Sequence, residues 1–143
     1  MMKVSAKIDY ACRALLELAV HWPDATPLQI SAIAKRQKIP MKYLVHILIA
    51  LKELGYVEST RGKSGGYILT KPPKEIKLGA IVKNFGGLGY SENETLKIRK
   101  STHVIDSVWK EVEESIFSSI DMINFEVLCN RHRIAGQTLT YEI

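Results

Sequence analysis

Residues 56–70 contain the feature that most constrains the fold of this chain: two short extended segments joined by a glycine-rich turn. The segments are residues 56–61 and 66–70, and Gly62-Lys63-Ser64-Gly65 lies between them. Glycines at this place are typical of a β-hairpin, because they tolerate the backbone conformations that a tight turn requires. The pattern predicts a hairpin with a protruding basic tip.

Three helical patterns precede the hairpin. Residues 5–21 and 41–54 repeat apolar side chains at helical spacing, and Gly55 fits the left-handed cap that ends the second of these segments. Between them, Thr26 and Pro27 fit the N-cap and the first helical position of a short helix. The order helix, helix, turn, helix, hairpin predicts a winged helix-turn-helix.

The strongest helical pattern of the second half covers residues 102–123, after a predicted short helix at 78–85 and a polar loop at 90–101. A small winged domain can hardly cover the apolar stripe of this long helix, because its first three helices already form a core. We expect the stripe to pack against a second copy of the chain; folding back onto its own domain is the alternative. The predicted dimer residues are Ile105, Val108, Trp109, Val112, Ile116 and Ile120.

These patterns predict a mainly α fold with a small β-hairpin, in a chain of 143 residues that suits one domain with an appended element. Residues 1–85 are expected to form the winged helix-turn-helix DNA-binding domain. Residues 86–101 are expected to be an effector or linker loop, and residues 102–143 a dimerisation helix with a C-terminal tail.

The charge of the chain is distributed unevenly. Residues 1–83 hold 14 Lys and Arg against 6 Asp and Glu, a net charge of +8, and residues 84–143 hold 6 against 9, a net charge of −3. A basic half favours a polyanionic partner such as double-stranded DNA, whereas chance clustering on solvated faces is the plain alternative.

Several other classes of protein do not fit the sequence. No apolar run approaches the roughly 18 residues of a membrane span, and the N-terminus lacks the apolar core of a signal peptide. Two distant cysteines, Cys12 and Cys129, form neither a disulfide framework nor a four-thiolate metal site. We therefore expect a cytoplasmic protein with no membrane partner.

The motifs of common enzymes are also missing. The four histidines form no metal-binding pair at helical spacing. Gly62-Lys63-Ser64 resembles the end of a phosphate-binding loop, but no glycine stands five residues before it, and a hairpin surrounds it. Cys129 and His132 could contribute to a metal site, which nothing nearby completes. We expect no catalytic residue and no metal site.

The predicted third helix has an outward face that suits a DNA reader. Lys42 and His46 lie near its start, the part of a recognition helix that reaches base edges, and Tyr43 can donate its hydroxyl to a phosphate. Val45 and Ile49 are apolar on the same face. They fit contacts with thymine methyl groups, or packing against a neighbouring element or partner subunit.

The hairpin tip offers Arg61 and Lys63 beside glycines that allow close approach to a phosphate, and an arginine there can enter a narrow minor groove. A plain solvated hairpin is the alternative. The residues predicted at the DNA are Lys7, Tyr10, Gln29, Lys42, Tyr43, Val45, His46, Arg61, Lys63 and Tyr67.

The chain resembles the Rrf2 family of bacterial transcription regulators. The resemblance rests on GYVESTRGKSGGYIL at residues 55–69, PPKEI at 72–76, Tyr10-Ala11 upstream and VWKEV at 108–112, and it covers about residues 2–132. It implies a dimeric winged-helix repressor or activator that contacts DNA through its third helix and the wing arginine, here Arg61. We expect a homodimer that reads a palindromic operator, as a repressor.

The chain departs from that family in the loop before the long helix. Many members sense iron–sulfur status through three cysteines, whose positions correspond here to Ser91, Lys97 and His103. Because clusters are held chiefly by cysteine thiolates, this departure predicts no iron–sulfur cluster and no other cofactor. The resemblance then implies a response to a small-molecule effector or a partner protein.

Two further functions remain open from the sequence. In the first, Val45 and Ile49 form a docking patch for a metabolic enzyme, and the chain regulates through protein interaction. In the second, atypical ligands such as His103 make the chain a metal or redox sensor.

Overall fold

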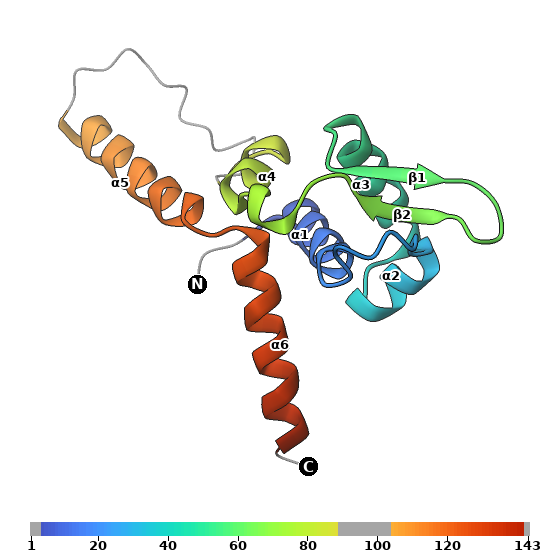
Figure 1. Cartoon of the computed structure of the whole chain (residues 1–143). Helices are drawn as coiled ribbons and strands as arrows, with labels where there is room; N and C mark the ends of the chain where they lie inside the picture. The colour runs from blue at the N-terminus through green and yellow to red at the C-terminus, as the bar shows by residue number, and fades with distance from the viewer. Residues whose placement is uncertain (1–3, 89–103, 142–143) are drawn as a thin grey trace.

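The computed structural model describes residues 4–88 and 104–141, with only the backbone described over residues 138–141. Figure 1 shows α1 (Ala6–Ala19) near the centre, with a helix-turn-helix and a hairpin on one side and two long C-terminal helices reaching outward. The other elements are α2 (Ile30–Gln37), α3 (Met41–Glu53), β1 (Val57–Thr60), β2 (Gly66–Leu69), the 3-10 helix η1 (Pro73–Glu75), α4 (Leu78–Asn84), α5 (Val104–Asp121) and α6 (Phe125–Tyr141). The mainly helical fold with one small hairpin confirms the predicted fold class.

α1 organises the core of the molecule. The Ser5 hydroxyl accepts a hydrogen bond from the backbone N–H of Ile8 (3.3 Å) and caps the first turn, as expected. Side chains at helical spacing along α1 are buried, among them Ala11, Leu15 and Leu18. α2, α3, α4, α6 and β2 all contact α1, so this helix sets the positions of the elements around it.

The hairpin forms the expected wing. β1 and β2 pair antiparallel, with Val57 opposite Leu69 at the base and Thr60 opposite Gly66 near the tip. Both residues at the base are buried in the core, whereas the tip extends outward in Figure 1. The apolar base therefore anchors the wing and leaves its basic tip in solvent.

α2 begins at Ile30, which corrects the start predicted at Pro27. Leu28 is paired with β2 instead: its N–H donates to the Tyr67 carbonyl (2.9 Å), and the Tyr67 N–H donates to the Leu28 carbonyl (2.8 Å). Because the backbone of this residue is engaged with a strand, the helix starts after it, with Gln29 as N-cap.

The C-terminal segment, for which the sequence predicted only a tail, forms the helix α6. The Asn124 side-chain oxygen accepts a hydrogen bond from the backbone N–H of Val127 (3.0 Å) and caps the start of this helix. Phe125 and Cys129, one turn apart, are buried in the core, and α6 packs against α1 and η1. Tertiary packing thus stabilises a helix whose sequence pattern is weak by itself.

α5 differs from the other long helices, because no residue along its described length is buried. It ends at Asp121, slightly before the predicted end, where the Leu78 N–H donates to the Ile123 carbonyl (2.9 Å) and holds the following turn against α4. Phe117 and Ile120 are half-buried against the core, and the rest of the apolar stripe is exposed. Among the residues that the structure describes, no helix has the length and apolar character of a membrane span.

Candidate DNA interface

α3 has a buried face and an exposed face. The inward side chains that anchor it in the core are Leu44, Ile47, Leu48 and Leu51. The predicted DNA-reading residues on the opposite face are exposed: Lys42, Tyr43, Val45, His46 and Ile49. Val45 and Ile49 keep 37% and 46% of their surface accessible, so packing within this chain leaves both available to a partner.

An aromatic and cationic stack organises the start of α3. The ring of Tyr43 lies 6.1 Å from that of Tyr10 between centroids, and the Lys42 ammonium lies 5.1 Å from the Tyr43 ring centroid. Contacts of this kind contribute about 0.5–1 kcal/mol each at exposed sites. Tyr10, half-buried on α1, therefore supports the side chains at the N-terminal end of α3.

The wing tip is a tight basic turn. The Gly65 N–H donates to the Gly62 carbonyl (3.0 Å), and Gly62 has a φ of +105°, a conformation that favours glycine. Arg61 and Lys63 are both exposed at this turn. A compact loop of small residues thus presents two cations, which suits contact with phosphates or the minor groove.

The other predicted DNA contacts lie at different places. Gln29 is exposed, and its Nε2 donates to the Lys63 carbonyl at the wing tip (3.3 Å). Tyr67 is half-buried in β2, next to the core. Lys7 is exposed on α1, with its ammonium 5.8 Å from the Phe85 ring centroid. The structure thus brings Gln29 and Tyr67 to the wing and places Lys7 beside the end of α4.

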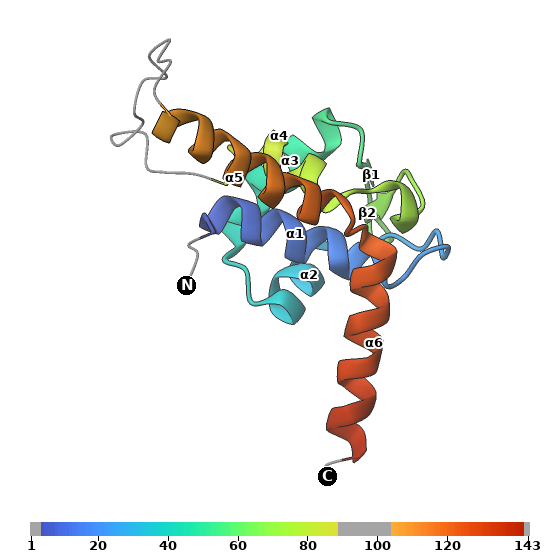
Figure 2. The ribbon, with the colours of Figure 1, turned by 90° about the vertical axis from the view of Figure 1, so that its left-hand side faces the viewer.

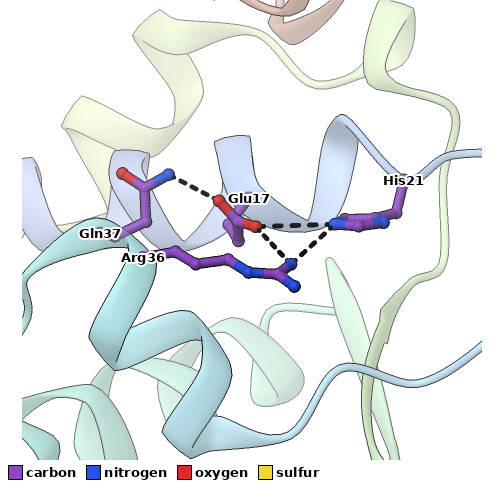
Figure 3. Close-up of polar contacts among 4 residues, drawn as sticks. All are labelled: Glu17, His21, Arg36 and Gln37. Carbon is purple, nitrogen blue, oxygen red and sulfur yellow. Dashed lines mark hydrogen bonds and ion pairs between the residues drawn. The ribbon is translucent and has the colours of Figure 1, made fainter.

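A buried carboxylate that the sequence reasoning missed joins α1 to α2 (Figure 3). Glu17 of α1 is only 5% exposed, and one of its oxygens lies 3.0 Å from the Arg36 guanidinium while the other accepts a hydrogen bond from Gln37 (2.8 Å). His21 lies 3.6 Å from the first oxygen and 3.3 Å from the guanidinium nitrogen. This cluster holds α2 against α1 and thereby positions the helix-turn-helix.

Competing effects act on the pKa of Glu17. Burial raises this pKa, but the hydrogen bonds from Gln37 and Arg36, together with the Arg36 charge, outweigh burial and leave the pKa below its usual value. A detectable signal was present in the sequence, since Glu17 interrupts an apolar helical face between Leu15 and Leu18. A charge in that position requires partners, and α2 supplies two of them.

The donor atoms of the chain do not fit a cysteine-held iron–sulfur cluster. Cys12 of α1 is half-buried, and burial, with the nearby Asp9 charge, raises the pKa of its thiol to about 12. Cys129 of α6 is buried, which also raises its pKa. Within residues 4–88 and 104–141, no three His, Cys, Asp or Glu side chains gather as a metal site. Ser91, Lys97 and His103 lie outside the described residues.

Comparison with known proteins gives consistent matches. The model of a protein family described as Rrf2, iron-dependent transcriptional regulator, matches residues 4–131. A protein of Synechocystis sp., provisionally named as an HTH-type transcriptional regulator, is 46% identical over 81 residues, or 57% of this chain and 54% of that protein. The chain thus spans about half the length of this relative.

Two regulators named IscR match over most of the chain. The HTH-type transcriptional regulator IscR of Erwinia tasmaniensis is 31% identical over 143 residues, which cover 93% of this chain and 82% of that protein. Among solved structures, that of T. potens IscR superposes with a TM-score of 0.79 at 32% identity, covering 94% of this chain and 90% of that one. The similarity therefore includes the winged region and the C-terminal helices together.

Proposed function

The chain belongs to the Rrf2 family of transcriptional regulators, and from this premise we propose that it is a repressor that binds a palindromic DNA operator as a homodimer. It is a DNA-binding regulator rather than an enzyme, as its relatives are. The operator, the dimer and the direction of regulation are the parts that we propose, together with a place in the cytoplasm.

The observation that carries the DNA-binding surface is the joint exposure of α3 and the wing. Figure 1 places α3 and the hairpin side by side, and α3 contacts β1. Lys42 and His46 of α3 and Arg61 and Lys63 of the wing are all exposed, in the half of the chain with net charge +8. We propose that α3 enters the major groove while the wing contacts the adjacent backbone or minor groove.

The apolar residues of α3 give this surface a means of discriminating bases. In the proposed complex, Val45 contacts a thymine methyl group in the major groove, and Ile49 is less close because it lies one turn further along α3. A solvated helix face gains nothing from two exposed β-branched apolar side chains, whereas a base-reading face does. Lys42, Tyr43 and His46 then supply the polar contacts nearby.

The exposed stripe of α5 supports the homodimer. Ile105, Val108, Trp109, Val112 and Ile116 are all exposed in the single chain. Apolar surface of this extent on one helix face is best covered by an identical face, which gives a two-fold dimer. Ile120, also predicted at the interface, packs partly against its own core and would contribute less. Two-fold symmetry would set the two α3 helices about one DNA turn apart.

We propose that the signal sensed by this regulator is not an iron–sulfur cluster. The loop positions that carry cysteines in the cluster-binding members hold Ser91, Lys97 and His103 here, and the two cysteines of the chain lie on α1 and α6. A small-molecule effector or a partner protein remains as the signal. Visible absorbance or bound iron after anaerobic purification would contradict this proposal.

Arg61→Ala provides the test of DNA binding. We expect the operator, obtained by selecting genomic fragments on the wild-type protein, to bind about tenfold or more weakly to the variant. The slope of the logarithm of the binding constant against the logarithm of the salt concentration should also become less steep, by about the amount that one phosphate contact contributes. Fluorescence anisotropy across salt concentrations measures this slope. The matched control is Arg133→Ala, which removes an exposed arginine from α6.

Two outcomes would contradict the proposal. Equal affinity of Arg61→Ala and wild type across salt concentrations would remove the wing from the interface. No binding of any genomic fragment by micromolar wild-type protein at low salt would favour the docking function, in which Val45 and Ile49 contact an enzyme.

A further inference from the structure

The segment before α2 contacts the wing at two points. On the outer part of β2, Leu28 exchanges two backbone hydrogen bonds with Tyr67 (2.9 and 2.8 Å). At the tip, Gln29 Nε2 donates to the Lys63 carbonyl (3.3 Å). The outer part of the wing is thus connected to the start of the helix-turn-helix at two points, in addition to its connection through the chain.

Gly66, near the tip of the wing, makes this close approach possible. A Cβ atom at this position would lie 2.2 Å from the Leu28 carbonyl oxygen, and the φ of Gly66 is +147°, which side chains rarely adopt. The backbones of β2 and residue 28 therefore meet at a distance that only glycine allows. This contact holds the outer part of β2 close to the segment before α2.

Gln29 is used in an unusual way for an N-cap residue. It occupies the cap position of α2, but its side chain makes no capping hydrogen bond to that helix. Its amide reaches across 34 positions of sequence to a backbone carbonyl of the wing turn. The turn is otherwise closed locally, by the Gly65 N–H and the Gly62 carbonyl. Gln29 therefore ties the tip of a glycine-rich loop to the start of a helix.

We propose that Gln29 is a positioning residue for the wing, acting on DNA through the Lys63 carbonyl rather than by contacting a phosphate itself. Holding this carbonyl sets the orientation of the turn that carries Arg61 and Lys63. A tip that is already ordered loses less conformational entropy when the wing binds DNA. The Gln29 hydrogen bond therefore strengthens operator binding although Gln29 itself does not contact the DNA. The inference rests on the proposed DNA binding of the wing.

A double-mutant cycle separates positioning from direct contact. The variants are Gln29→Met, which keeps the length of the side chain and removes the donor, Arg61→Ala, and the double variant. Gln29→Met should weaken operator binding about threefold to tenfold, the range for loss of one hydrogen bond. In the Arg61→Ala background, the same substitution should change affinity less than about twofold. The reason is that the binding free-energy changes of two residues that act through one contact do not add. Gln137→Met on α6 serves as the matched substitution at an exposed site.

A second readout needs no DNA. The backbone amides of Lys63, Ser64 and Gly65 should show lower heteronuclear NOE values in Gln29→Met than in the wild type, with Gln137→Met unchanged. Equal losses of affinity in both backgrounds would identify Gln29 as a direct DNA contact, and either unchanged NOE values or unchanged affinity would overturn the proposal. If the wild-type protein binds no DNA, the proposed function fails, while the NOE comparison still tests whether Gln29 orders the wing.

Discussion

α1 and α5 carry similar apolar stripes but lie in opposite environments. Seven of the 14 residues of α1 are buried, whereas none of the 18 residues of α5 is. α1 contacts α2, α3, α4, α6 and β2, whereas α5 packs against α4 and reaches outward in Figure 1. In the turned view of Figure 2, α5 lies across the front of the molecule. A helical repeat of apolar residues therefore fixes which face of the helix is apolar, but not which surface covers that face.

The two regions also differ in charge. The half that contains α1, α3 and the wing has a net charge of +8, and the half that contains α5 has −3. A basic surface attracts a polyanion, while an acidic helix with an exposed apolar stripe suits another protein surface. α1 therefore builds the part of the molecule that we assign to DNA, and α5 the part that we assign to a second copy.

The largest expected effect separates a buried apolar position on α1 from an exposed apolar position on α5. Leu15→Ala in α1 should lower the free energy of unfolding by about 2–5 kcal/mol, because it leaves a cavity around a fully buried side chain. Val104→Ala, at a position that is 73% exposed in α5, should cost less than about 0.5 kcal/mol. Urea denaturation at fixed protein concentration measures both values. Equal losses in the free energy of unfolding would mean that Val104 is as well buried as Leu15.

The next effect tests what covers α5. Trp109→Asp should raise the dissociation constant of the dimer about 30-fold or more, since a central aromatic residue at an interface commonly contributes about 2 kcal/mol or more. Sedimentation equilibrium gives the constant, and circular dichroism should show an intact winged region. Met122→Asp is the control, because Met122 is apolar and 83% exposed yet lies beyond the stripe. A dimer of unchanged strength in Trp109→Asp would remove α5 from the interface.

A smaller effect concerns the polar cluster that joins α1 to α2. Glu17→Gln should lower the free energy of unfolding at neutral pH by about 1–3 kcal/mol, toward the lower end because Arg36 is half exposed and screened by solvent. No residue of α5 is buried, so replacing a carboxylate on that helix should not change the free energy of unfolding in this way. Glu113→Gln, an exposed α5 carboxylate, is therefore the control and should be close to neutral.

The pH dependence of this effect follows from the lowered pKa of Glu17. A carboxyl whose folded pKa is depressed stabilises the fold fully above its unfolded pKa and loses this contribution as pH falls through the folded value. The difference between wild type and Glu17→Gln should therefore be constant near neutrality and shrink below about pH 4, under the usual Glu value. Denaturation series at several pH values measure it. A difference that grew on acidification would contradict the ion-pair assignment.

Much of the winged region could be predicted from sequence. The exposed and buried faces of α3 follow from helical periodicity, because its apolar side chains repeat on one side. The wing turn follows from its glycines, since Gly62 adopts a backbone conformation that other residues avoid. Both features depend on residues within one or two turns of each other.

The errors share one cause. Pro27 looks like a helix start, yet Leu28 belongs to a pairing with β2, and the start moves to Ile30. α6 has a weak pattern of its own, but Phe125 and Cys129 find cover in the core. In each case a distant segment competes for or completes a local preference, and propensity alone does not reveal which segments meet.

The winged helix-turn-helix, its outward basic residues and the apolar stripe on α5 could therefore be predicted before any fold was known, because these features depend on local periodicity and turn chemistry. The contacts of Glu17 with Arg36 and Gln37, and the hydrogen bond from Gln29 to the wing, could not be predicted in this way. These contacts join residues 19, 20 and 34 positions apart, so they exist only once packing on α1 has brought their elements together.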